Sequence, residues 1–74
     1  MKLCELEVGN KAVIKKISLC GTIRRRLFDI GLIEGTKIMC VMQSPSGDPI
    51  AYRIRGSVIA LRQKDSKFIE IAKI

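Results

Sequence analysis

The chain has 74 residues, no histidine and a formal charge of +7, and 47% of its residues are apolar. A chain of this length forms one domain, residues 1–74, whose apolar content is typical of a folded rather than a disordered protein. No apolar run approaches the roughly 20 residues of a membrane span, and the N-terminal residues lack the apolar stretch of a secretory signal. We therefore expect a cytoplasmic protein that does not insert into a membrane.

The first predicted elements are a short lead-in over residues 2–9 and a strand over Lys11–Ile17. Gly9 and Asn10 form a turn signal between them. Ile14 and Ile17 are the expected core positions of the strand. Because they are three residues apart, strict alternation is broken, and we expect a bulge or the end of the strand between them.

One short helix follows, and its start and end are both marked in the sequence. Thr22 is the expected N-cap, because its hydroxyl can accept a backbone N–H of the first turn. Ile23, Leu27 and Ile30 fall at i, i+4 and i+7, so they would form one buried stripe. Gly31 follows directly and is expected to hold a positive φ.

The other side of this helix is charged. Arg24, Arg25 and Asp29 are expected to point into water, with Arg25 and Asp29 within reach of a weak surface pair. Arg26 flanks the apolar stripe, so the three arginines do not form one continuous patch. Phe28 also lies off the stripe. We expect it to fold over the edge of the core; the alternative is that it is left exposed.

Four further strands are predicted at residues 36–43, 50–55, 58–62 and 68–74, with a polar connection over residues 63–67. Residues 44–49, Ser-Pro-Ser-Gly-Asp-Pro, form the loop of a hairpin in which Asp48 caps the turn. Ile50, Tyr52 and Ile54 alternate inward. Closing five short strands on themselves removes the exposed sheet edges. The sequence therefore predicts a mainly β fold, a small five-stranded SH3-like barrel with one short α-helix inserted between strands 1 and 2.

The chemically reactive side chains are few and scattered. Cys4, Cys20 and Cys40 lie far apart in the sequence, which predicts free thiols used as small apolar fillers and no metal site. No histidine is available, and no two carboxylates have a spacing typical of paired catalytic acids. We therefore expect a binding module with no catalytic residues and no cofactor.

Four segments resemble the ferrous iron transport protein A (FeoA) family. They are residues 6–9 (Leu-Glu-Val-Gly), 26–35 (Arg-Leu-Phe-Asp-Ile-Gly-Leu-Ile-Glu-Gly), 44–50 (Ser-Pro-Ser-Gly-Asp-Pro-Ile) and 59–62 (Ile-Ala-Leu-Arg). Their order and spacing cover nearly the whole chain. The resemblance implies a small cytoplasmic SH3-like barrel that acts as an accessory or regulatory partner of a membrane permease. That permease carries a cytoplasmic G-protein domain and moves Fe(II).

Two surfaces are candidates for binding this partner. The helix face carries Arg24 and Arg25 with Phe28 at its edge, and arginine and aromatic residues are enriched at interface hot spots. We favour this face. The rival is the tip of the hairpin at Ser46, Gly47 and Asp48, because protruding loops often carry function.

An alternative function is a small basic β-barrel that binds nucleic acid. The charge of +7 permits it. Stacking platforms are nearly absent, however, because Tyr52 is the one aromatic residue in the central strands and it falls on the inward register. We expect no nucleic acid partner.

Overall fold

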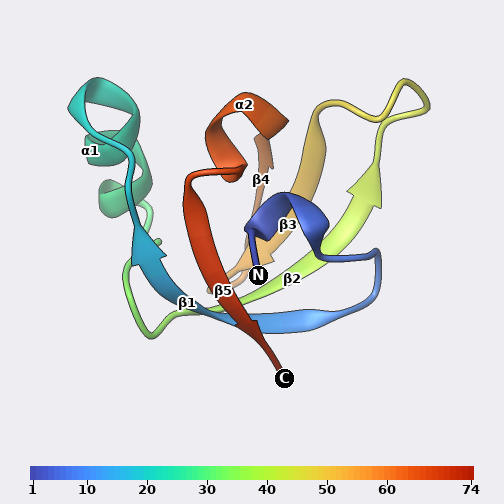
Figure 1. The fold of residues 1–74 in the computed structure, drawn as a ribbon, viewed down its shortest axis with the longest axis horizontal. Helices are drawn as coiled ribbons and strands as arrows, with labels where there is room; N and C mark the ends of the chain where they lie inside the picture. Colours follow the sequence, from blue (N-terminus) through green and yellow to red (C-terminus); the bar gives the residue numbers. More distant parts are fainter.

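Five antiparallel strands curl around one apolar core in the computed structural model, which describes residues 1–74 (Figure 1). The strands are β1 (Lys11–Ile17), β2 (Lys37–Gln43), β3 (Ile50–Ile54), β4 (Ser57–Leu61) and β5 (Ile69–Lys73). Their order in the sheet is β4-β3-β2-β1-β5, so the last strand lies beside the first. Helix α1 (Gly21–Asp29) lies between β1 and β2 in the chain. The predicted mainly β fold with one inserted helix is confirmed.

Two single-turn helices complete the fold. The lead-in contains a 3₁₀ turn, η1 (Leu3–Glu5), and the predicted polar connection between β4 and β5 contains α2 (Gln63–Ser66). Four residues are too few to show a helical period in the sequence, so α2 was not predicted. Neither of these turns, nor α1, is long and apolar enough to cross a membrane.

Strand β1 contains the predicted irregularity. Its register with β5 shifts between Ile14 and Lys16, as the broken alternation indicated. The core positions differ from the prediction, because Ala12 and Ile14 are buried whereas Ile17 is only half-buried. The bulge separates Ile17 from the inward register of the preceding residues.

Strand β3 provides the centre of the core. Ile50, Tyr52 and Ile54 are all buried, so the predicted alternation is confirmed. The Tyr52 hydroxyl donates to the Leu3 carbonyl oxygen at 3.3 Å, which joins η1 to the sheet. Burial, with the Cys40 thiol nearby as a smaller cause, raises the pKa of Tyr52 to about 12.

Strand β2 buries alternate side chains only in its first half. Ile38 and Cys40 are buried, and burial raises the pKa of the Cys40 thiol, which acts as an apolar filler. Met42, the next residue in this alternation, is 62% exposed. The register with β3 shifts between Cys40 and Met42, and this bulge turns Met42 outward.

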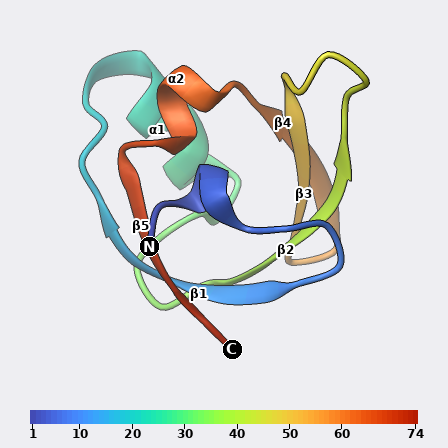
Figure 2. The same cartoon turned by 45° about the vertical axis from the view of Figure 1, so that its right-hand side comes forward.

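Strands β4 and β5 lie at the two ends of the sheet and do not pair with each other, and their outer edges differ (Figure 2). The outer edge of β5 is covered by the N-terminus: Lys2 forms a bridge with Glu70, and the Ile71 N–H donates to the Met1 carbonyl oxygen at 2.7 Å. No segment of the chain pairs with the outer edge of β4.

Candidate functional site

Helix α1 is fixed to the barrel by one buried leucine and by the turn that follows the helix. Leu27 is 4% exposed, and the Leu32 N–H donates to its carbonyl oxygen at 2.9 Å. Gly31 has the predicted positive φ, +93°. A Cβ at this position would lie 2.8 Å from Cδ of Arg55, so the Arg55 stem fills the space that the glycine leaves.

The start of α1 differs from the prediction. Cys20 is the N-cap and makes no side-chain cap, and Thr22 lies within the helix. Arg24 does not point freely into water as expected. Its Nη1 donates to the carbonyl oxygens of Ile17 at 2.7 Å and Leu19 at 3.2 Å. Strand β1 ends at Ile17, so these carbonyls need donors from elsewhere, and Arg24 supplies them.

The outward face of α1 leaves an aromatic and a cation without partners. Phe28 is 66% exposed, so the expected packing over the core edge is wrong and the alternative holds. Arg25 forms no ion pair, and the expected pair with Asp29 is absent. Ile30 was assigned to the buried stripe but is the C-cap and 41% exposed. Of the predicted stripe, only Leu27 is buried, and Ile23 is half-buried against the core.

A hollow of about 320 Å³ lies beside Phe28. It is lined in part by Leu32 and Ile33 from the turn after the helix and by Ile17 from the end of β1. The outward face of α1 therefore has an exposed ring next to a depression that is mostly apolar, with Arg24 and Glu34 at its rim. The Arg25 guanidinium is exposed on the same helix.

The tip of the β2–β3 hairpin is held by contacts within the molecule. The Gln63 N–H donates to the Asp48 carboxylate at 2.9 Å, and the Gln63 side chain donates to the Gly47 carbonyl oxygen at 2.8 Å. Ser46 donates its hydroxyl to the Asp48 carbonyl oxygen at 3.0 Å. Asp48 was expected to cap its own turn. Its carboxylate instead accepts a first-turn N–H of α2, with Arg62 3.8 Å away.

The structure does not bring the two predicted surfaces together. Helix α1 and the β2–β3 hairpin lie at opposite ends of the molecule in both views (Figures 1 and 2). Arg25 and Phe28 therefore form one candidate surface, and Ser46, Gly47 and Asp48 form another.

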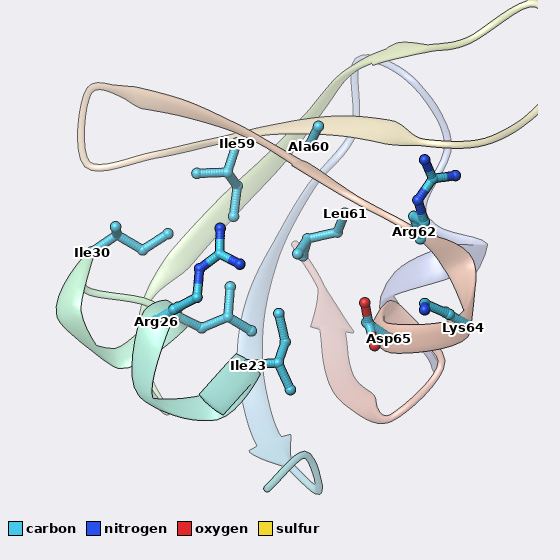
Figure 3. A pocket seen from close by; sticks show the side chains of 10 residues that line it. Ile23, Arg26, Ile30, Ile59, Ala60, Leu61, Arg62, Lys64 and Asp65 are labelled. Carbon is cyan, nitrogen blue, oxygen red and sulfur yellow. The ribbon is translucent and has the colours of Figure 1, made fainter. Parts of the chain in front are cut away.

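A groove of about 500 Å³ that sequence reasoning missed separates α1 from β4 (Figure 3). Ile23, Leu27 and Ile30 line it from the helix, and β4 and the start of α2 form the opposite wall. The sequence contains one signal for it, the apolar stripe of the helix. The stripe predicts which side of the helix is apolar, but it does not show which part of that side is left without contact to the barrel.

No metal centre is formed by the described residues. Cys4 is half-buried, Cys20 exposed and Cys40 buried, and all three are free thiols. No three side chains of the histidine, cysteine, aspartate and glutamate types cluster as metal ligands.

Comparison with known proteins identifies the family. A family model described as the FeoA domain matches residues 1–73. The chain belongs to the FeoA domain family. Among curated proteins, the chain is 36% identical over 74 residues to an Fe(2+) transport protein A/Fe(2+) transporter FeoB fusion protein of Porphyromonas gingivalis. That match covers the whole chain but only 9% of the fusion protein.

Solved FeoA structures have the same fold. The FeoA protein of Chlorobium tepidum is 32% identical with a TM-score of 0.95, and the match covers all of this chain and 70% of that one. FeoA of Stenotrophomonas maltophilia, described as a prokaryotic SH3 domain protein and solved in complex with zinc, is 26% identical with a TM-score of 0.85. The match covers 97% of this chain and 89% of that one. The predicted SH3-like barrel and FeoA resemblance are confirmed.

Proposed function

We propose that this FeoA domain is an accessory protein of ferrous iron uptake that binds the cytoplasmic part of a GTPase-containing Fe(II) permease. The observation that carries the proposal is the fusion protein, in which an FeoA part 36% identical to this chain is joined to an FeoB transporter. Fusion raises the effective concentration of two modules for each other, which is an advantage when the two modules bind one another. This role places the protein in the cytoplasm.

The outward face of α1 is the proposed contact surface. The guanidinium of Arg25 makes no ion pair, and the Phe28 ring is 66% exposed beside an apolar depression. Burying an arginine and an aromatic ring in a partner supplies much of the binding energy at typical interfaces. Arg24, the third predicted member, contributes indirectly, because its contacts with Ile17 and Leu19 hold the helix in place.

The test is direct binding to the cytoplasmic domain of the FeoB-type permease of the same organism. Calorimetry with the separately purified domain is expected to give saturable binding with both proteins folded. Exchange of Phe28 for alanine should weaken it, and exchange of Phe68, which is also exposed but lies beside β5, should not. Absence of saturable binding, in the nucleotide-free and nucleotide-bound forms of the domain, would contradict the proposal.

We propose a non-catalytic role and no nucleic acid partner. The side chains present offer no nucleophile–base pair, and the one aromatic ring on the strands, Tyr52, is fully buried. The rival surface is the outer sheet face, where a hollow is lined by cations, Lys11, Lys37, Arg53 and Arg55. A gel shift with RNA or DNA at ordinary salt that weakens steeply as salt rises would favour that rival.

A further inference from the structure

The groove between α1 and β4 follows the edge of the strand rather than one of its faces. Ile59, Ala60 and Leu61 are successive residues of β4, and all three line the groove. Successive side chains of a strand point to opposite faces of its sheet. A groove that touches all three must therefore lie along the free edge of β4, with α1 as its other wall (Figure 3).

The backbone along this edge has no partner in the molecule. β4 occupies one end of the sheet and pairs only with β3. None of the other backbone or side-chain hydrogen bonds of the molecule involves residues 57–61. The outer edge of β5, by contrast, is covered by residues 1 and 2. An open strand edge is a template on which another extended chain can pair.

The side chains that line the groove indicate which kind of extended peptide it would bind. The floor is aliphatic, with Ile23 and Leu27 from α1 facing Ile59 and Leu61 from β4. The rim carries the cations Arg26, Arg62 and Lys64 against one acid, Asp65. In Figure 3 the Arg26 side chain extends from the helix toward Ile59, and Arg62 and Lys64 flank the far end. Such a groove favours a segment that alternates apolar and acidic residues.

We propose that the edge of β4 binds an extended, acidic peptide segment of the partner as a sixth strand of the sheet. The five residues of β4 offer a pairing length of about 17 Å, enough for five residues of an added strand. Apolar side chains of the segment would enter the groove between α1 and β4, and its carboxylates would meet the cationic rim. The assignment of this segment to the permease rests on the proposed function. The preference of the groove for an extended acidic segment does not depend on it.

The experiment uses two capped heptapeptides as probes, one alternating glutamate with valine and the other alternating lysine with valine. The isotope-labelled chain is titrated with each peptide and followed by NMR. We expect the glutamate peptide to shift the amide signals of residues 57–61 and to slow solvent exchange of the alternate amides in β4 that do not bond with β3. The lysine peptide should do neither. Binding of both peptides alike, or shifts confined to other strands, would overturn the proposal.

A pair of matched charge reversals separates the groove from general attraction to a basic protein. Arg26→Glu with Lys64→Glu changes the groove rim, and Lys11→Glu with Arg53→Glu makes the same charge change on the outer sheet face. The first pair should weaken binding of the glutamate peptide roughly tenfold, and the second should leave it within about twofold. Equal weakening by both pairs would mean non-specific electrostatics and would overturn the proposal.

The permease domain distinguishes this inference from the proposed function. If the glutamate peptide binds along β4 but the permease domain does not bind, the docking edge stands and the proposed partner is wrong. If the domain binds and the first charge-reversed pair binds it as well as the unchanged chain does, the proposed function stands and the β4 edge is not the docking site.

Discussion

Helix α1 and the β2–β3 hairpin both protrude from the barrel, but their polar groups serve different purposes. At the hairpin, the Asp48 carboxylate and the Gly47 carbonyl oxygen accept hydrogen bonds from Gln63. On the outward face of α1, Arg25 makes no ion pair and Phe28 is largely exposed. Exposed polar residues on a loop indicate a partner surface only where the fold itself does not use them. By this criterion the helix is the stronger candidate.

The largest expected effect comes from removing the buried contact of the helix. Leu27→Ala should lower the free energy of unfolding by about 2–5 kcal/mol, because it empties a site that is 4% exposed. Denaturant unfolding measures this loss. Binding of the partner by this variant is measured at a temperature at which the variant is folded, so that lost binding is not caused by unfolding. A loss below about 1 kcal/mol would mean that the helix is not held by its apolar side.

The turn that ends the helix should be the next most sensitive position. Gly31→Val should cost about 1–2 kcal/mol from the positive φ alone, and more because its Cβ would meet the Arg55 stem. Gly9→Val is the matched control: Gly9 has φ +90° and no atom within 4 Å of its Cβ position. The difference in thermal unfolding between the two variants measures the effect of the contact with Arg55. Equal losses of stability in the two variants would show that the Arg55 side chain moves aside without destabilising the protein.

A smaller effect is expected at the hairpin, confined to stability. Asp48→Ala removes the acceptor for the Gln63 N–H and should cost about 0.5–2 kcal/mol, as loss of a helix cap does. Ser46→Ala removes one exposed hydroxyl contact and should change stability by less than about 0.5 kcal/mol. Neither change should alter binding to the permease domain once folded fractions are matched. Lost binding with unchanged stability would make the hairpin the interface.

How far the sequence predicts this molecule depends on the range of the interaction involved. The alternation of β3 and the positive φ of Gly31 are local patterns, and both are confirmed. Features that depend on distant partners were missed. The Asp48 carboxylate bonds with a residue 15 positions away. Arg24 bonds with the carbonyls of Ile17, at the end of the preceding strand, and Leu19, in the connection after it. The groove along β4 was also missed, because the sequence pattern of α1 or of β4 alone does not show how far apart the two elements lie in the fold.

A variant with an equally small expected change in stability decides between the helix face and the hairpin. Arg25→Glu with Phe28→Ala alters side chains that make no hydrogen bond or ion pair, so unfolding should shift by less than about 0.5 kcal/mol. Binding to the permease domain should weaken about tenfold or more, because an aromatic residue and an arginine are removed from the proposed contact. Isothermal calorimetry of the unchanged chain and of the doubly substituted chain, under the same conditions, measures this loss.

Arg24 is unsuitable for this test despite lying on the same helix, because its guanidinium holds the carbonyls of Ile17 and Leu19. Arg24→Ala alone should cost about 0.5–1.5 kcal/mol of stability, the range for one net hydrogen bond, which makes it a control for indirect effects. If Arg25→Glu with Phe28→Ala binds as tightly as the unchanged chain while Arg24→Ala binds weakly, the position of the helix matters but its outward face does not. The contact would then lie on another side of α1, where the groove beside β4 is the remaining surface.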